Sequence, residues 1–204
     1  MGARRVELLE RRFAYEGHFR MLRYRIRHEQ FSGEMGPVLS REVFERGWAA
    51  CVLPYDPVRD EVVLVEQFRM GAYEGGAEDP WMIEPIAGIV EPGETPEDVA
   101  RREAREEAGL EIGALIEIAD YFTSPGGASE HCKAYIGRAD TRHAGGVHGL
   151  DGEGEDIRVH VLPFDEALRW LRGGRLRVST TLITMQWLAL NIDEVRRRFG
   201  AAAA

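Results

Sequence analysis

Residues 87–112 read AGIVEPGETPEDVARREAREEAGLEI and place eleven charged side chains in 26 positions. The stretch carries the signals of a helix start, because Thr95 can act as the N-cap, Pro96 takes the first helical position and Asp98 can close a capping box. Gly109 supplies the C-terminal stop. We therefore expect a helix between Pro96 and Gly109.

This predicted helix has a stripe of small side chains that would let it lie close against a sheet: Ala100, Ala104 and Ala108. Glu103, Glu106 and Glu107 stand at i, i+3 and i+4, and so project together from an adjoining face. One interpretation is a solvated helix with salt bridges, such as Arg102 with Glu106. That interpretation leaves unexplained why Glu103 and Glu107 share a face.

A like-charge pair at i, i+4 costs roughly 0.2–0.5 kcal/mol on an isolated helix. A hard divalent cation would turn the repulsion between Glu103 and Glu107 into attraction, and oxygen ligands suit Mg²⁺ or Mn²⁺. The spacing by itself therefore leaves two interpretations open, a salt-bridged surface helix and a metal site.

The wider pattern is more specific than the helix. Gly88 is followed after five residues by Glu94, and after seven more by REAREEAGL at residues 102–110. This string resembles the signature of the Nudix hydrolases at every specified position, with Ala104 and Leu110 in its two aliphatic places. The resemblance implies a loop, a helix and a loop whose glutamates hold Mg²⁺ against a diphosphate.

Composition limits the class of protein. The chain has 204 residues, 44% of them hydrophobic and 30% charged, which is typical of one main globular unit. A net charge of −9 argues against a general nucleic-acid-binding protein, because affinity for the phosphate backbone depends on Lys and Arg. The N-terminal residues lack an apolar signal core, and no run approaches the roughly 18 apolar residues of a membrane span. With two isolated cysteines, Cys51 and Cys132, we expect a reduced cytoplasmic chain with buried thiols and no membrane or nucleic-acid partner.

Short runs of apolar and β-branched residues, bounded by Gly, Pro or Asp, predict strands at 19–27, 48–56, 60–69, 81–88, 130–139 and 157–163. Helical patterns cover 165–174 and 179–199. Strands outnumber dispersed helices, so the fold class is α+β, and the resemblance implies the Nudix α/β/α sandwich with an N-terminal antiparallel strand extension. We expect the extension at 1–46 and the Nudix domain at 47–200. The extension is too small for a core of its own, and one candidate for what it packs on is a partner subunit.

Outside the box, the chain is similar to the ADP-ribose pyrophosphatase branch over roughly residues 15–190. The similarity includes RYRIRHEQFSGEM, PWMIEPIAG, SPGGASE and GLDGEGEDIRVHVLP, together with the run from Arg41 to Arg69. It implies hydrolysis of ADP-ribose to AMP and ribose 5-phosphate, and a homodimer in which the N-terminal strands swap over the partner. Rival substrates are other nucleoside diphosphate sugars, such as GDP-mannose, and NADH. A rival of another class is a silent domain that senses ADP-ribose, and the intact glutamate trio argues against it.

The same resemblance implies a metal site of two or three Mg²⁺ ions, with Mn²⁺ as an alternative. Its implied ligands are the carbonyl of Ala87 and the carboxylates of Glu103, Glu106 and Glu107. Arg102 would hold the helix carboxylates in register.

Substrate contacts are also implied by the resemblance. Arg69 and Glu84 match substrate-contacting positions, and Arg41 matches an arginine supplied by the partner chain. A guanidinium suits phosphate oxygens. His18 or Phe19 would stack on adenine, and the Gly-rich turn with Ser124 and Gly126 would approach the ligand.

The loop at 140–156 has five glycines and a cluster of acids, so its composition is that of a mobile, solvated loop. In the resembling branch this loop carries the catalytic base, and both Glu153 and Glu155 match positions with that role or a ligand role. We favour Glu153 as the base because it lies farther from the following strand, and Glu155 as an accessory metal ligand. The six histidines have no zinc-site spacing, and His160 is expected to be structural.

Overall fold

The structure is a computed structural model that describes residues 3–150, 152 and 154–200. The chain forms two compact units. The first consists of Met1–Trp48, as far as it is described, together with Phe122–His131, and the second of Ala49–Tyr121 with the residues from Cys132 onward. The two units are described separately below.

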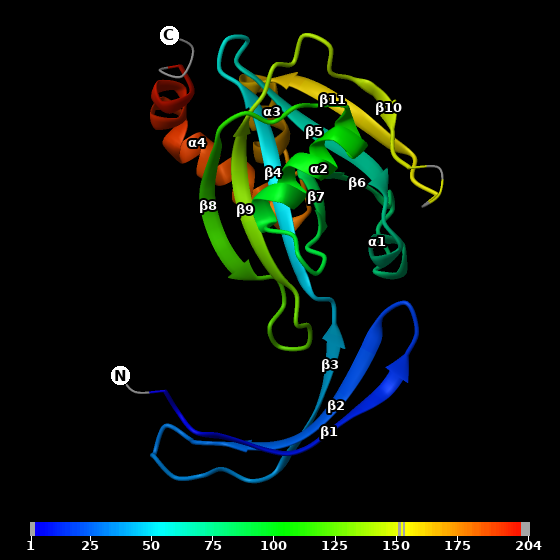
Figure 1. The fold of residues 1–204 in the computed structure, drawn as a ribbon, viewed down its shortest axis with the longest axis vertical. Coiled ribbons are helices and arrows are strands. Elements are labelled where there is room, and N and C mark those ends of the chain that lie inside the picture. Colours follow the sequence, from blue (N-terminus) through cyan, green and yellow to red (C-terminus); the bar gives the residue numbers. More distant parts are fainter. Residues whose placement is uncertain (1–2, 151, 153, 201–204) are drawn as a thin grey trace. The chain divides into compact units, whose positions relative to one another are not determined.

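The first unit is built on an antiparallel sheet in the order β1-β2-β3, with β1 at Val6–Glu16, β2 at Arg20–His28 and β3 at Leu39–Glu45 (Figure 1). The alternating pattern at residues 19–27 predicted β2, whereas the long strand β1 was not anticipated. Val6 and Tyr15 on β1 keep 68% and 65% of their surface exposed. Leu22 is the one fully buried residue among those that the structure describes in this unit. The unit therefore has almost no apolar core of its own.

The second unit is an eight-stranded sheet with the main order β10-β11-β5-β4-β9-β8, in which β6 pairs with β5 and β7 with β4. Its strands are β4 (Trp48–Asp56), β5 (Glu61–Phe68), β6 (Trp81–Glu84), β7 (Ile86–Ile89), β8 (Leu115–Phe122), β9 (His131–Arg138), β10 (Gly146–His148) and β11 (Ile157–Pro163). Its helices are α1 (Met70–Glu74), α2 (Pro96–Ala108), α3 (Phe164–Arg172) and α4 (Ser179–Gly200). The sequence did not predict β8, α1 or β10. The last of these pairs with β11 inside the segment expected to be a plain loop.

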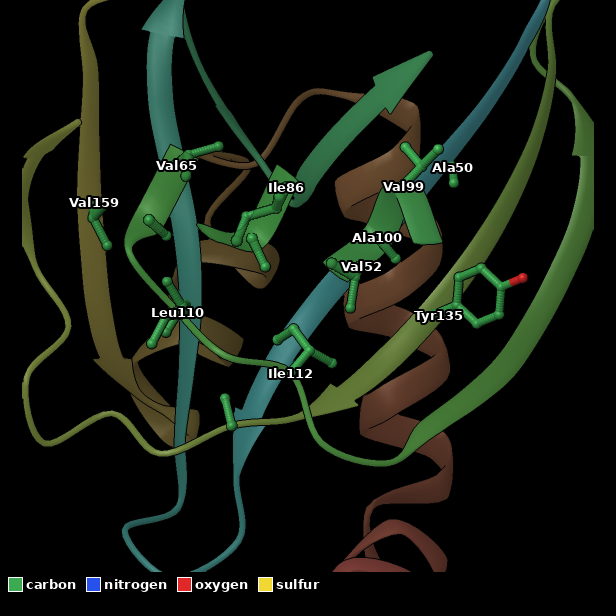
Figure 2. Close-up of a cluster of buried hydrophobic side chains, with 14 of the residues drawn as sticks. Ala50, Val52, Val65, Ile86, Val99, Ala100, Leu110, Ile112, Tyr135 and Val159 are labelled. Atoms are coloured by element: carbon green, nitrogen blue, oxygen red, sulfur yellow. The ribbon is translucent and has the colours of Figure 1, made fainter. Parts of the chain in front are cut away.

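Side chains that alternate along the central strands build two cores. On β4, Val52 belongs to the cluster that packs against α2, and the next residue, Leu53, belongs to the cluster that packs against α3 and α4. Strand β5 behaves in the same way, with Val65 on the α2 side and Leu64 on the opposite side. Figure 2 shows the cluster on the α2 side. The second unit is thus the expected α/β/α sandwich.

Helix α2 begins and ends where the sequence predicted. The Thr95 hydroxyl accepts from the Asp98 N–H at 3.2 Å, and the Asp98 carboxylate accepts from the Thr95 N–H at 3.0 Å, which completes the capping box. Gly109 ends the helix in the left-handed conformation with φ 62°. The alanine stripe is fully buried against the sheet. With both ends and one face fixed, the adjoining glutamate face has a defined orientation.

The structure also tests the predictions for the cysteines, for His160 and for membrane-spanning helices. Cys51 and Cys132 are buried and form no disulfide, as predicted, but their sulfurs lie 3.8 Å apart, which was not anticipated. His160 is structural, because its Nε2 lies 2.8 Å from a Glu66 carboxylate oxygen and its ring meets Trp170 edge-on. Within the described ranges, no helix combines the length and apolar character needed to cross a bilayer.

Candidate active site

The glutamate face of α2 lies against β7, and Glu107 is its most deeply buried member. Glu107 keeps only 3% of its surface exposed. One of its carboxylate oxygens accepts from the Ala87 N–H at 3.3 Å. The box helix and the strand that precedes it therefore meet at a carboxylate, where an apolar contact would be the ordinary arrangement.

Gly88 explains how Glu103 fits at the same place. A Cβ atom built on Gly88 would lie 1.8 Å from the Glu103 Oε1 atom and 2.3 Å from its Cδ atom. Any other residue at position 88 would therefore displace the Glu103 carboxylate. The glycine of the signature is required by a close approach of a side chain to the backbone.

Burial makes the charged forms of both glutamates costly. Desolvation, and next the charge of Glu103, raises the pKa of Glu107 to about 8, although the Ala87 N–H acts in the opposite direction. Desolvation raises the pKa of Glu103 to about 7, against the opposing effect of the Arg102 charge. Two neighbouring carboxyls with raised pKa values are typical of a functional site.

Arg102 is the centre of an ion-pair network on the same helix. Its Nη1 atom donates to Glu103 at 2.7 Å and to Glu106 at 3.0 Å, and its Nε atom donates to Glu94 at 2.9 Å. These carboxylates raise the pKa of the guanidinium above its usual range, with the hydrogen bond to Glu94 as the largest cause. Arg102 thus contacts two of the helix glutamates and ties them to the loop before α2.

Arg69 and Glu84 form a second pair in this unit. The Arg69 Nε atom donates to the Glu84 carboxylate at 2.7 Å. Glu84 lies on the face of the sheet that α2 covers. It pairs with Val65 in the β5–β6 register, and Val65 belongs to the cluster that packs against α2. Burial raises the pKa of Glu84, and the charge of Arg69 opposes that effect. The charge of Arg69 also acts to lower the pKa of Glu107, against the larger effect of burial, which raises it.

The segment before β11 brings a further carboxylate to this group. The charge of Glu155 contributes to the raised pKa values of both Glu103 and Glu107. One of its oxygens accepts from the Leu150 N–H at 3.1 Å. Glu153, the favoured base, lies outside the described residues.

The remaining predicted substrate contacts belong to the first unit: His18, Phe19, Arg41, Ser124 and Gly126. The ring of Phe19 meets His18 edge-on at 4.6 Å, and the Arg46 guanidinium lies 4.8 Å from its centroid. The guanidinium of Arg41 donates to the carbonyl of Ser40 at 2.8 Å. The carbonyl of Ser124 accepts from the N–H of Ala128 at 2.9 Å, which closes the Gly-rich turn.

A sizeable cavity lies away from the candidate site. A cavity of about 560 Å³ lies at the turn between β4 and β5, where its lining includes Asp56, Arg59 and Arg138. None of the α2 glutamates lines it. The candidate site is defined instead by the gathering of buried carboxylates and arginines at β7 and α2.

Most of the glutamates and arginines at α2 and β7 are predicted by the sequence, but two residues that contact this region are not. Glu94 was read as part of the signature only, yet it accepts two hydrogen bonds from Arg102. His148 was not singled out at all, and its ring lies beside Gly109. The spacing of the signature was a signal for Glu94. No sequence pattern marks His148, because its contact depends on how the chain returns to the end of α2.

The donor set fits a hard divalent cation. All the side chains concerned are carboxylates, and the two most buried lack enough positive charge nearby to keep their pKa values low. In the part of the chain that the structure describes, no three acidic, His or Cys side chains already converge as metal ligands. Glu103 and Glu106 each accept a hydrogen bond from Arg102 instead.

Comparison with known proteins agrees with this geometry. The family model described as "NUDIX domain" matches residues 45–181. This chain belongs to the Nudix family, as the box signature predicted.

Within the Nudix family, the chain is similar to several proteins named as pyrophosphatases. The chain is 47% identical over 198 residues to a protein of Escherichia coli strain K12 named ADP-ribose pyrophosphatase, which covers 97% of this chain and 94% of that one. A Haemophilus influenzae protein of the same name is 40% identical, over 94% of this chain and 89% of its own length. A GDP-mannose pyrophosphatase of Salmonella arizonae is 38% identical over 152 residues, 74% of this chain and 78% of that one. The predicted resemblance to the ADP-ribose pyrophosphatase branch is confirmed.

A solved structure supports the fold. A protein described as an ADP compounds hydrolase superposes with a TM-score of 0.66 and covers 93% of this chain and 97% of that one. Its sequence identity is 17%, so the likeness concerns the fold alone.

The raised pKa of Glu107 predicts how stability changes with pH in metal-free protein. Stability that depends on the protonated carboxyl is fully present below about pH 4.5 and is lost as the pH rises through about 8. Glu107→Gln cannot ionise, so its free energy of unfolding should overtake that of the parent as the pH rises, by about 1.4 kcal/mol for each unit of pKa shift. Urea unfolding in EDTA at several pH values from about 5 to 9 measures the difference.

Glu97→Gln is the matched control, because Glu97 is an exposed carboxylate on the same helix. A constant difference between Glu107→Gln and the parent over this range would contradict the burial argument. Added Mg²⁺ should raise the melting temperature of the parent more than that of Glu107→Gln, since a bound ligand stabilises the state that binds it.

Proposed function

We propose that this chain hydrolyses ADP-ribose to AMP and ribose 5-phosphate in a reaction that depends on Mg²⁺. The observation that carries the proposal is the pair of Glu107, which is buried against β7, and Glu103, which is partly buried and accepts a hydrogen bond from Arg102. The similarity to proteins named ADP-ribose pyrophosphatase over nearly the whole chain supports the choice of substrate. Mn²⁺ is an alternative ion, and the proposed number of ions is two or three.

The residues that would hold the ions are Glu103, Glu106, Glu107, Glu155 and the carbonyl of Ala87. Divalent ions there would neutralise charge on the diphosphate and lower the pKa of bound water. The protein's own part is to keep these carboxylates together although burial and mutual repulsion oppose their ionisation. Arg102 offsets some of that cost through its bonds to Glu103 and Glu106.

Arg69 is proposed to bind the diphosphate. Its guanidinium is already oriented by Glu84, so little side-chain freedom is lost when a phosphate oxygen arrives. In the reaction, water forms a new bond to one phosphorus and the bridging P–O bond breaks. A carboxylate takes the proton from the water, an effect worth about 10²–10⁴ in rate. No covalent intermediate is required.

GDP-mannose is the second candidate substrate, because a GDP-mannose pyrophosphatase is also related over 74% of this chain. NADH is a further alternative that we expected from the sequence. All three share the diphosphate, so the box residues alone do not choose among them.

A substrate panel tests the proposed function. ADP-ribose, GDP-mannose and NADH are compared at fixed Mg²⁺ by phosphate release in a coupled phosphatase assay, with products identified by chromatography. We expect the highest kcat/KM for ADP-ribose, AMP and ribose 5-phosphate as products, and loss of most activity in Glu107→Gln. Preference for another substrate would contradict the ADP-ribose assignment, and no turnover of any of the three would contradict the enzyme assignment.

The base is proposed to be Glu153, with Glu155 as the accessory ligand. A base must reach the attacking water while the α2 glutamates are committed to metal. Glu153→Gln should lower kcat by about 10²-fold or more while ADP-ribose binding is retained, and Glu155→Gln should lower it less. Single-turnover rates and binding by calorimetry measure the two effects. A greater loss in Glu155→Gln would reverse the assignment, and no loss in either would place the base elsewhere.

We also propose a homodimer in which Arg41 completes the partner's site. The near absence of a core in the first unit supports the assembly. Arg41 pairs with no carboxylate among the described residues, so its charge is free for a ligand.

Mixing two inactive variants tests the dimer. Arg41→Ala and Glu107→Gln are each expected to lose activity. A hybrid of the two restores one complete site only if Arg41 acts across the subunits, so activity should reappear after subunit exchange. Sedimentation of an active monomer, or no recovery on mixing, would contradict the proposal.

The compartment is proposed to be the cytoplasm. Cys51 and Cys132 are buried and form no disulfide, although their sulfurs lie 3.8 Å apart. Reduced neighbouring thiols are typical of a reducing compartment.

A further inference from the structure

The short strand β10 brings His148 to the end of the box helix. The ring carbon Cε1 of His148 lies 3.1 Å from the place where a Cβ atom on Gly109 would stand. The ring is held there by its Nε2 atom, which donates to the carbonyl of Gly145 at 2.8 Å. Gly109 is therefore required for two reasons, the left-handed backbone at φ 62° and the space that His148 occupies.

The next residue, Gly149, lets the chain fold back onto Glu155. Gly149 has φ +110°, and a Cβ atom built on it would lie 2.7 Å from the Glu155 Cβ atom and 3.1 Å from the Glu155 carbonyl oxygen. Two hydrogen bonds between Leu150 and Glu155 hold this turn of the chain together. The Leu150 N–H donates to the Glu155 carboxylate at 3.1 Å, and the Glu155 N–H donates to the Leu150 carbonyl at 3.4 Å.

These contacts form a continuous connection from the end of α2 to the Glu155 carboxylate. His148 contacts the end of the helix, Gly149 follows it directly, and Glu155 packs on Gly149. On the far side, His148 pairs with Ile157, the first residue of β11.

We propose that His148 and Gly149 are positioning residues, which fix the Glu155 segment against the C-terminal end of α2 and thereby orient the Glu155 carboxylate, which in the proposed function acts together with Glu103 and Glu107. The inference rests on the proposed function, in which these three carboxylates act together. The two residues act through Glu155 and touch no substrate. A displacement of about 1 Å at such a site can cost about 10²-fold in rate.

The alternative is that His148 and Gly149 only stabilise the fold. The two readings differ in what a substitution should change. A structural role predicts lower stability with unchanged kcat in the protein that remains folded. A positioning role predicts a lower kcat at nearly unchanged KM for ADP-ribose, and a local change at the amide of Leu150.

Gly149→Ala and its control Gly146→Ala separate a steric effect from backbone strain. Gly146 has φ +91°, so both alanines would be strained, but a Cβ on Gly146 meets only the His148 Nε2 atom, at 3.8 Å. We expect Gly149→Ala to lower kcat by about tenfold or more and at least as far as Glu155→Gln does, with KM nearly unchanged. Gly146→Ala should keep kcat within about threefold of the parent value.

Substitutions of His148 test the same connection without backbone strain, and so remain informative should Gly149→Ala fail to fold. His148→Ala removes both the contact with Gly109 and the bond to Gly145. His148→Gln keeps a side-chain N–H that can reach the Gly145 carbonyl. We expect His148→Ala to lower kcat and His148→Gln to recover most of the loss.

Hydrogen exchange at the Leu150 amide gives a readout that does not depend on activity. The Leu150 N–H donates to the Glu155 carboxylate, so we expect its exchange to be slow in the parent, faster in Gly149→Ala and in His148→Ala, and unchanged in Gly146→Ala. Equal kcat in Gly149→Ala and Gly146→Ala, or an unchanged Leu150 amide in both His148→Ala and Gly149→Ala, would overturn the proposal. If the parent does not hydrolyse ADP-ribose, the proposed function fails by itself, and the amide measurements still decide whether His148 and Gly149 hold Glu155.

Discussion

The close approach of α2 to β7 is the contact on which the candidate site depends. It requires a glycine at position 88, where a Cβ atom would collide with the Glu103 carboxylate. It also requires the buried alanine stripe, which brings the helix near enough for Glu107 to reach the Ala87 N–H. Burying carboxylates in this way is unfavourable unless they gain partners. The protein retains two costly carboxyls at one place, which is expected where a cation is to be bound.

The sheet brings the other components to this contact. Strands β5 and β6 pair so that Glu84 falls on the α2 side, and Arg69, directly after β5, reaches across to it. Strand β11 pairs with β5 on the opposite edge from β4, and the segment before β11 carries Glu155. Three segments far apart in the sequence therefore supply charges to one side of the sheet. The regular hydrogen bonds of these strands fix the backbone positions from which Arg69, Glu84 and the Glu155 segment extend.

The box accounts for diphosphate chemistry, and substrate choice must come from other parts of the chain. The relatives named for ADP-ribose and for GDP-mannose have different substrates but are both similar to this chain across most of its length. The residues predicted to stack on adenine lie in the first unit. That unit exposes apolar side chains on strand β1, whereas the second unit has a packed apolar core. In the proposed homodimer, the first unit would contribute to both specificity and assembly, with Arg41 acting in the partner's site.

The sequence by itself determined the box helix, its caps and the identity of the carboxylates, because those depend on interactions between residues a few positions apart. It also determined the family, since the signature combines seven fixed places. Tertiary structure decided which of the glutamates are buried and what balances their charge. The burial of Glu107 beside Ala87 and the clearance at Gly88 arise from contacts between residues 15 to 20 positions apart in the sequence. His148 is the clearest case, since nothing in its neighbourhood along the chain indicates the helix end that it contacts. Local hydrogen bonds and side-chain spacing can be read along a sequence, whereas packing between distant segments exists only after the strands have paired.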